Sequence, residues 1–191
     1  MGITSVMTRV KASRVCGLDC STKSLAFAIM EGEAPIQCGE ITFNGSTPFE
    51  RLKDARKKVR ALVNAGTFDG VEFIAIESAI MVHNVQVAID LAYVFGAIIS
   101  ELSEVCNELH KVAPISWQTG IGNGNLKAAE KAAIVEEFPG KSKTWYQNKG
   151  REIRKARTLA IARNYFKIED GSDNVGDAVG IALFSTRQLT R

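Results

Sequence analysis

The chain has 191 residues, of which 46% are hydrophobic, and this predicts one domain with a sizeable core, since two domains would each be small. Its 24 Lys and Arg residues nearly balance 21 Asp and Glu residues, which gives a net charge of only +3. The total charge therefore does not indicate an anionic partner, and any such partner must be inferred from where the positive residues lie. The most apolar window, residues 85–99, is too short to span a bilayer and no apolar signal region opens the chain, so we expect a soluble cytoplasmic protein with no membrane partner.

Residues 1–13 are polar and aperiodic, and we expect them to form a flexible N-terminal arm ahead of a single domain over residues 14–191. Three runs rich in β-forming residues come next, namely Arg14–Asp19, Ser24–Met30 and Ile36–Phe43. The connections between the runs are short, which predicts that the three strands pair antiparallel.

A helix and a buried strand are predicted after the third run. Thr47 and Glu50 have the spacing of a capping box, with Pro48 at the first helical position, and apolar residues then recur at helical spacing. The run Val71–Ile76 is apolar except for Glu72, as expected of a strand that is covered on both faces. Because a helix leads into this run, we expect a parallel crossover that places the strand at the centre of the sheet.

The segment from Asn84 to Glu108 has a helical pattern, but its apolar residues point in nearly every direction around the helix axis. One face of a sheet cannot bury them all. Two arrangements remain open, in which either other helices of the same chain or a second subunit covers the far side. Gly96 and Ala97 would permit close helix approach in both cases.

The rest of the chain is predicted to contain one short strand and three helices, with a glycine-rich loop over residues 119–125. The strand is His110–Ala113, and the helices are Leu126–Phe138, Arg151–Phe166 and Asn174–Gln188. The whole pattern predicts an α/β fold with a five-stranded mixed sheet, in which three antiparallel strands are followed by parallel ones, flanked by helices.

Three acidic residues stand at the edge of the predicted core. Asp19 ends the first strand, Glu77 ends the central strand, and Asp177 lies within the apolar last helix. Carboxylates in such places lose hydration and repel one another unless a cation joins them. Because Mg²⁺ prefers hard oxygen ligands, the three residues together predict a divalent-metal site.

The order of these elements and acids resembles the ribonuclease H-like nucleases, and among them most closely the RuvC-type Holliday-junction resolvases, including their phage relatives. The matching residues, within 15–185, are Gly17-Leu18-Asp19, Ser24 to Ile29, Ile76-Glu77, Asn84, Leu91, Gly96, Pro114, Thr119-Gly120, Gly122-Asn123-Gly124 and Asp177-Ala178. The resemblance implies a ribonuclease H-like nuclease domain that cuts four-way junctions or other branched DNA. It also implies a homodimer that works in the cytoplasm of a bacterium or of a phage-infected cell.

The resemblance further implies two Mg²⁺ or Mn²⁺ ions in the active site and hydrolysis of a phosphodiester by water. Asp19, Glu77 and Asp177 would be catalytic metal ligands, and the family's fourth ligand lies three residues before the last Asp, at a position that is Asn174 here. Asp173 shares roughly the same helical face, so it could substitute as the fourth ligand, or it could simply cap the helix. Asp170 is the next candidate.

A basic stretch with two aromatic residues is the predicted DNA contact surface. Positive charge neutralises phosphates, and aromatic rings can stack on unpaired bases near a branch point. A solvated helix face is the alternative interpretation, because Ile153, Ala156 and Ala160 supply an apolar side for packing. The basic and aromatic residues are Lys141, Lys143, Trp145, Tyr146, Lys149, Arg151, Arg154, Lys155 and Arg157.

Further DNA contacts are expected outside that stretch. Lys127 and Lys131 follow the glycine-rich loop, in a region where resolvases of the RuvC type often carry basic residues. Ile80 or Met81, immediately beyond Glu77, could wedge at unpaired bases or simply pack into the fold.

Two other functions remain open. The sequence Asp19-Cys20-Ser21-Thr22, followed by a strand, resembles the first phosphate loop of actin-like and sugar-kinase phosphotransferases, although the chain is short for their two-lobed design. The amide at Asn174, in place of an acid, favours instead a non-catalytic protein that binds junctions.

Overall fold

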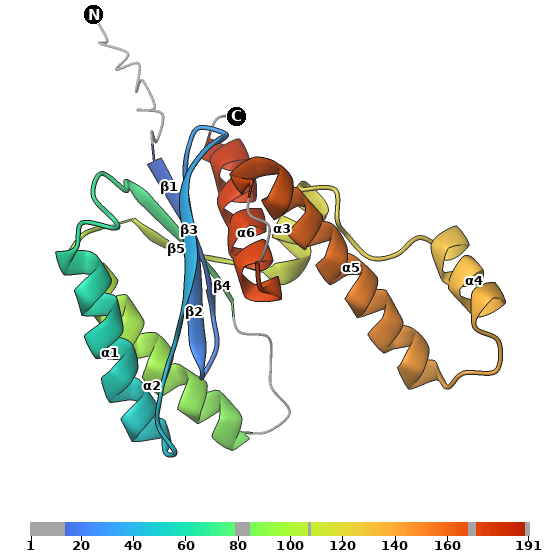
Figure 1. Cartoon of the computed structure of the whole chain (residues 1–191), viewed down its shortest axis with the longest axis horizontal. Coiled ribbons are helices and arrows are strands. Elements are labelled where there is room, and N and C mark those ends of the chain that lie inside the picture. The colour runs from blue at the N-terminus through green and yellow to red at the C-terminus, as the bar shows by residue number, and fades with distance from the viewer. Residues whose placement is uncertain (1–13, 79–84, 107, 168–170, 190–191) are drawn as a thin grey trace, which may run out of the picture.

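The sheet has the strand order β3-β2-β1-β4-β5 in the computed structural model, which describes residues 14–78, 85–106, 108–167 and 171–189 (Figure 1). β1 pairs antiparallel with β2 and β2 with β3, whereas β1 and β4, and β4 and β5, are parallel. The predicted mixed sheet is therefore confirmed. The strands are β1 (Arg14–Cys20), β2 (Ser24–Glu31), β3 (Ala34–Thr42), β4 (Phe73–Glu77) and β5 (Leu109–Val112).

Most predicted helices are present, with some different bounds. The helices are α1 (Pro48–Asn64), α2 (Val85–Leu102), α3 (Pro114–Gly120), α4 (Ala128–Glu137), α5 (Lys143–Phe166) and α6 (Asp173–Leu189). The capping box of α1 is confirmed, since Thr47 Oγ1 accepts a hydrogen bond from Glu50 N at 3.2 Å and Glu50 Oε2 accepts one from Thr47 N at 3.1 Å.

Two helices differ from the prediction in ways that affect the site. α5 begins at Lys143 and not at Arg151, because Ser142 Oγ accepts a hydrogen bond from Trp145 N at 3.2 Å and so caps an earlier first turn. α3 lies where only the start of a loop was expected, and Pro114 at its first turn suits a helix start. α2 also ends at Leu102, earlier than the predicted Glu108.

Helices cover both faces of the sheet (Figure 1). α1 and α2 lie on one face and pack on the strand residues Cys16, Leu18, Ile74 and Ile76. α6 lies on the other face, with α3 and the C-terminal half of α5 beside it, and packs on the small residues of that face, such as Ala26, Ala28 and Ala75. The core is thus divided by the sheet into two layers.

Small residues allow α6 to approach the sheet closely. A Cβ atom built on Gly17 of β1 would lie 2.3 Å from Ala178 O and 2.4 Å from Ala182 N, both backbone atoms of α6. On α6 itself, a Cβ on Gly180 would lie 2.6 Å from Cζ3 of the buried Trp117. Glycine is therefore required at both positions by space, and the helix backbone rests almost directly on β1.

One side of α2 is apolar and exposed. Val85 is 72% exposed, and Phe49 on the neighbouring helix α1 is 61% exposed. The Phe49 ring contacts Tyr93 of α2 at a centroid distance of 5.5 Å. α2 has 18 residues, a mean hydropathy of 1.6 and 22% of its residues buried, so by length and composition alone it could cross a membrane. Glu101, only 4% exposed and paired with Arg56 and Arg60 of α1, ties α2 into the folded domain and would be costly in a bilayer.

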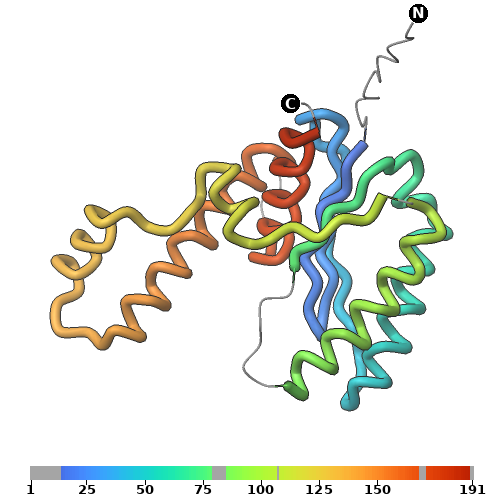
Figure 2. Tube along the Cα trace, turned by 180° about the vertical axis from the view of Figure 1, so that it is seen from behind, coloured from blue at the N-terminus to red at the C-terminus, as the bar shows by residue number. Residues whose placement is uncertain are grey.

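A hairpin of two helices projects away from the sheet (Figures 1 and 2). It consists of α4 and the N-terminal half of α5, and we call residues 125–154 the α4–α5 hairpin. At its base, Asn123 Nδ2 donates hydrogen bonds to Arg154 O and Thr158 Oγ1, both at 2.7 Å. Asn123 is 2% exposed, so this buried amide fixes where the hairpin leaves the domain.

Candidate functional site

Asp19 and Glu77 lie side by side at the ends of adjacent strands. β1 and β4 are parallel and Leu18 pairs with Ile76, so the next residue on each strand is one of the two acids. Side chains alternate along a strand, and Gly17 and Ala75 both face α6. Asp19 and Glu77 therefore point to the same face, towards α6.

Asp177 joins them from that helix. It directly precedes Ala178, whose carbonyl oxygen meets the position of a Cβ on Gly17, two residues before Asp19. The close packing of α6 on β1 thus delivers Asp177 to the strand ends that carry the other two acids. The structure brings together three residues that the sequence separates widely.

The electrostatics confirm that these carboxylates interact. Burial, then repulsion from Glu77 and Glu40, raises the pKa of Asp19 to about 7, and the positive charge of Lys155 opposes this shift. Burial, then repulsion from Asp19 and Glu77, raises the pKa of Asp177 to about 7, again opposed by Lys155. The group of acids therefore carries more negative charge than its surroundings balance.

This donor set suits a hard divalent cation in its chemistry. Carboxylate oxygens are the ligands that Mg²⁺ and Mn²⁺ prefer, and a cation would offset both the burial and the repulsion that raise the two pKa values. As they stand, no three His, Cys, Asp or Glu side chains in the described part of the chain lie close enough to enclose an ion. Binding would require these side chains to draw together.

Trp117 of α3 positions Glu77, and no sequence pattern predicted this role. Trp117 is fully buried, and its Nε1 atom donates a hydrogen bond to Glu77 Oε2 at 2.7 Å. Burial raises the pKa of Glu77, and this hydrogen bond opposes the shift by stabilising the charged form. The Trp117 ring also lies against Gly180 of α6. It therefore links α6, which carries Asp177, to β4, which carries Glu77.

Replacing Trp117 with Phe should move the pH dependence of the site upwards. A hydrogen bond to a charged group is worth about 1.5–3 kcal/mol, so without this hydrogen bond burial should raise the pKa of Glu77 further. Deprotonation, and with it Mn²⁺ binding, should then need a higher pH. The measurement is the Mn²⁺-induced rise in melting temperature between pH 5.5 and 8.5.

The control for Trp117→Phe is Trp145→Phe in the α4–α5 hairpin, which should leave this pH profile unchanged. Both variants lose an indole ring, so both should lose some stability without metal. If Trp117→Phe lowered stability but left the midpoint of the pH profile in place, Trp117 would be a packing residue with no influence on Glu77.

Glu40 of β3 is a fourth acid of this face. Asp19 pairs with Ala26, and Ala26 pairs with Glu40, so the three residues form one row across the sheet. Asn174 Nδ2 donates a hydrogen bond to Glu40 Oε1 at 2.7 Å, and Ser172 Oγ donates one to the other carboxylate oxygen. Burial acts to raise the pKa of Glu40, but these hydrogen bonds outweigh it and hold the pKa below its usual value, whereas the pKa of Asp19 is raised. Glu40 thereby holds the first turn of α6 against β3.

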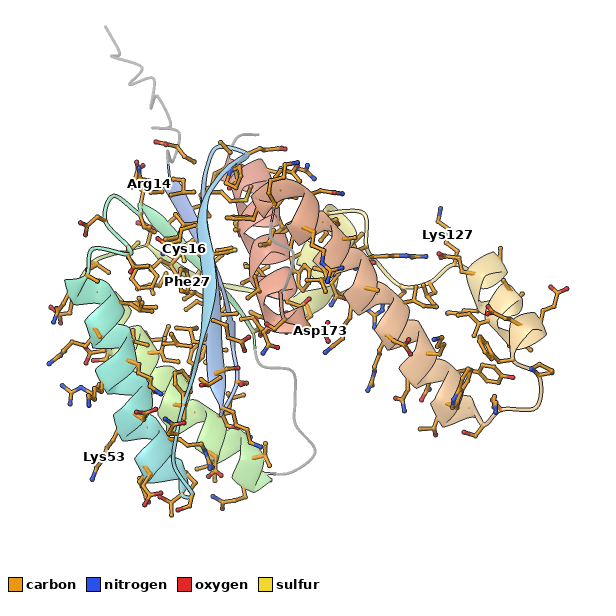
Figure 3. All side chains as sticks on the ribbon, in the orientation of Figure 1. Arg14, Cys16, Phe27, Lys53, Lys127 and Asp173 are labelled. Atoms are coloured by element: carbon orange, nitrogen blue, oxygen red, sulfur yellow. The ribbon has the colours of Figure 1, made fainter. Side chains whose placement is uncertain are left out.

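Asp173, at the start of α6 (Figure 3), is held by a lysine. Its Oδ2 atom lies 3.1 Å from Lys155 Nζ of α5, and both side chains are about half exposed. Asp173 is also close enough to Asp177 to contribute to the rise in the pKa of Asp177. Asp170 lies outside the described residues. The role of a fourth ligand stays a prediction for Asp173.

The predicted DNA contacts lie mostly on the α4–α5 hairpin. Lys127 precedes α4 (Figure 3), Lys131 is on α4, Lys141 lies in the α4–α5 turn, and the others are on α5. Lys155 and Arg157 follow the hairpin on α5, where Lys155 pairs with Asp173 beside the acids and Arg157 pairs with Glu130. Trp145 and Tyr146 also have packing roles. The Trp145 ring contacts Phe138 at 5.2 Å, and Tyr146 Oη donates a hydrogen bond to Phe138 O at 2.6 Å. Met81 and Ile80 lie outside the described residues.

Comparison with known proteins supports the fold. No protein-family model matches the chain, and no curated protein sequence matches it significantly. The structure is similar to two structures of RuvC from Thermus thermophilus, one of them in complex with a Holliday junction substrate. For the complex the TM-score is 0.61 at 13% identity, covering 92% of this chain and 95% of that one. For the other the TM-score is 0.60 at 13% identity, covering 92% and 96%.

A third similar structure is the yeast mitochondrial Holliday junction resolvase Ydc2, with a TM-score of 0.46 at 12% identity, covering 94% of this chain and 80% of that one. This likeness is too low to add support. The two RuvC structures confirm the predicted ribonuclease H-like fold. At 13% identity they show the fold alone.

Proposed function

We propose that this chain is a structure-selective DNA endonuclease that hydrolyses phosphodiesters in four-way (Holliday) junctions or other branched DNA. The observation that supports it most is the meeting of Asp19, Glu77 and Asp177, from β1, β4 and α6, on one face of a ribonuclease H-like sheet. The same fold in RuvC, which has been solved with a Holliday junction substrate, supports branched DNA as the substrate.

Asp19, Glu77 and Asp177 would hold Mg²⁺ or Mn²⁺, two ions per site, in this proposal. Such ions activate water as a nucleophile and stabilise the charge that develops on the leaving oxygen. Asp173 is the proposed fourth ligand. Its ion pair with Lys155 is about half exposed and so is worth at most about 1 kcal/mol, which leaves Asp173 free to change partner. Lys155 would then be available to a DNA phosphate beside the acids.

The proposed DNA surface continues from Lys155 along α5 to the α4–α5 hairpin. Lys127, Lys131, Lys141, Lys143, Lys149, Arg151, Arg154 and Arg157 would contact phosphates there. Trp145 and Tyr146 are proposed to shape that surface, because Phe138 engages both.

We include a homodimer and an intracellular location in the proposal. Two active sites related by two-fold symmetry would suit a four-way junction, and the exposed apolar side chains of Val85, Ile89, Tyr93 and Phe49 offer a surface for a second copy. All four cysteines are free thiols in the structure, which agrees with a reducing compartment.

A non-catalytic junction-binding protein is the alternative, and one observation favours it. The amide of Asn174 is bound to Glu40, and Asp173 is bound to Lys155, so neither offers the acids an unpaired fourth carboxylate. Binding without cutting would distinguish this alternative from the proposed nuclease.

The test is cleavage of a synthetic four-way junction labelled on each strand in turn. We expect paired nicks at related positions on two opposing strands with Mg²⁺ or Mn²⁺, no cutting in EDTA, and at least about tenfold slower cutting of a linear duplex of the same sequence. Tight binding to the junction with no cutting in Mg²⁺, Mn²⁺ or Co²⁺ would establish the non-catalytic alternative. An absence of binding to any branched DNA would refute the proposed function itself.

A further inference from the structure

A groove runs between α4 and the N-terminal half of α5, away from the acids. Its volume is about 680 Å³, which is typical of pockets that hold one small organic molecule. Leu126 and Ile134 are 7% and 8% exposed and form an apolar floor, and Tyr146 and the half-exposed Val135 line it as well. The groove therefore has an apolar interior on an otherwise polar hairpin.

The cations that line the groove lack acidic partners. Lys131, Lys143, Arg151 and Arg154 are lining residues, and no Asp or Glu is among the residues that line it. Within the described parts of the chain, none of the four forms an ion pair, and Arg154 bonds only to the neutral Gln118. This leaves an uncompensated positive charge around an apolar interior.

Three of the four cations of α5 that do not line the groove have their charge balanced within the protein, and the fourth, Arg163, lies near the C-terminal end of the helix. Lys149 pairs with Glu152 at 2.8 Å, Lys155 pairs with Asp173 at 3.1 Å, and Arg157 pairs with Glu130. Along residues 143–157 of α5, the cations without an acidic partner are therefore the ones that line the groove. A ligand with negative charge would restore that balance.

The walls of the groove are held in place before any ligand binds. Tyr146 Oη donates to Phe138 O at 2.6 Å and accepts a hydrogen bond from Lys141 N at 3.2 Å, so its ring cannot turn away. Arg154 Nη1 donates to Gln118 Oε1 at 2.8 Å. A site whose side chains are already ordered loses little entropy on binding.

We infer that this groove binds an unpaired nucleotide of branched DNA, with the base against Leu126, Ile134 and Tyr146 and the phosphates on the surrounding cations. A nucleotide combines the two properties that the groove selects, an apolar flat ring and a negative charge. Asn125 and Gln147 at the groove supply amides that can hydrogen bond to the edge of a base. A base inside a duplex is stacked on both sides and offers the groove no free ring face.

This inference rests on the proposed function for the identity of the ligand as DNA, but its test needs no cleavage. The experiment compares the affinity of the full chain, in EDTA, for two fluorescent four-way junctions by anisotropy. One junction is fully paired, and the other carries two unpaired nucleotides at the branch point. We expect the second to bind about tenfold more tightly, because stacking of even one unpaired base on an aromatic ring adds an affinity of about that size.

Two matched pairs of variants locate the effect. Val135→Glu introduces an acid into the groove, whereas Ala133→Glu introduces the same charge at an exposed position of α4 that does not line it. Arg151→Gln removes a cation of the groove, and Arg163→Gln removes an exposed cation elsewhere on α5. Val135→Glu and Arg151→Gln should abolish the preference for unpaired nucleotides, and the two controls should keep it.

Three results would overturn the inference. The first is equal affinity of the unmodified chain for the two junctions. The second is retention of the preference in Val135→Glu. The third is a change from dimer to monomer in Val135→Glu but not in Ala133→Glu, which would make the groove a contact between subunits. Each leaves the proposed function standing, provided that both junctions are bound. Failure to bind either junction would refute the proposed function.

Discussion

Asp19→Asn should abolish metal-dependent cleavage of the junction while leaving the metal-free protein as stable as before or more stable. Loss of a residue that merely supports a metal ligand costs about 10–100-fold, so loss of a ligand itself should cost at least about 100-fold in rate. Stability should not fall, because the substitution removes one of the carboxylates for which burial, and then mutual repulsion, raises the pKa of Asp19 and Asp177 to about 7.

The pH dependence gives a second measure of the same effect. An unfolded Asp titrates near pH 4, so between about pH 4 and pH 7 the folded state holds protons that the unfolded state has released. The free energy of unfolding without metal should therefore fall as pH rises through this window and reach its low value above about pH 7. Asp19→Asn should make the fall smaller, as urea unfolding in EDTA at pH 5 and pH 8 would show.

Asp69→Asn is the control for this variant, since Asp69 is exposed and lies in the connection before β4, at the opposite end of that strand from Glu77. It should cut the junction at the normal rate and show the pH dependence of the unmodified chain. Marked destabilisation of metal-free Asp19→Asn at pH 8 would mean that Asp19 holds the fold together and is no metal ligand.

Gly17→Ala should destabilise the protein by at least about 3 kcal/mol, at the upper end of what overpacking costs. The new Cβ would lie 2.3 Å from Ala178 O and 2.4 Å from Ala182 N, and both are backbone atoms that cannot rotate away. α6 would have to move off the sheet, carrying Asp177 away from Asp19. Urea unfolding should show the loss of stability, and Mn²⁺ should no longer raise the melting temperature of the variant.

Gly96→Ala is the matched control, because a Cβ on Gly96 of α2 meets nothing within 4 Å. Alanine favours a helix over glycine by about 1 kcal/mol, so this variant should be as stable as the unmodified chain or slightly more so. A Gly17→Ala protein within about 1 kcal/mol of the unmodified chain would show that α6 does not rest on β1 as closely as described.

The strand pairing of the sheet, and the positions of Asp19, Glu77 and Asp177 at the edge of the core, could be predicted from the sequence because the signals for them are local. Asp19 and Glu77 each end an apolar run, and a strand that is buried up to an acid must stop near the surface. Asp177 stands out because the helix around it is otherwise apolar. The antiparallel pairing followed from short connections, and the parallel pairing from the helix α1 between β3 and β4.

The residues that organise the acids were not predictable, because their roles depend on contacts between distant segments. Trp117 reaches Glu77 only because α3 forms, and a helix of seven residues is too short to show a periodic pattern. Glu40 lies beside Asp19 only through the register of β2 with both neighbours. The first turns of α5 were missed because residues 143–150 carry no continuous apolar stripe, as they project beyond the core.

The fourth ligand illustrates the limit of a motif. The sequence shows an amide at position 174 and an acid at 173, and spacing alone does not rank them. In the structure each has a partner of its own, Glu40 for Asn174 and Lys155 for Asp173. If the proposed function holds, a bound cation would recruit the residue whose partner it displaces more easily, and a half-exposed lysine is easier to displace than a network of hydrogen bonds.

The continuity of α5 has a mechanical consequence. The helix runs unbroken for 24 residues, about 36 Å, from Lys143 at the far end of the α4–α5 hairpin to Phe166. Lys155 lies in its second half and touches Asp173. An unbroken helix resists bending. A force that tilts the outer end of α5 must therefore either bend the helix or move Lys155 relative to Asp173 and the neighbouring acids. In the proposed function, DNA bound to the outer end of the α4–α5 hairpin would in this way change the position of Lys155 beside the acids, without any change in the sheet.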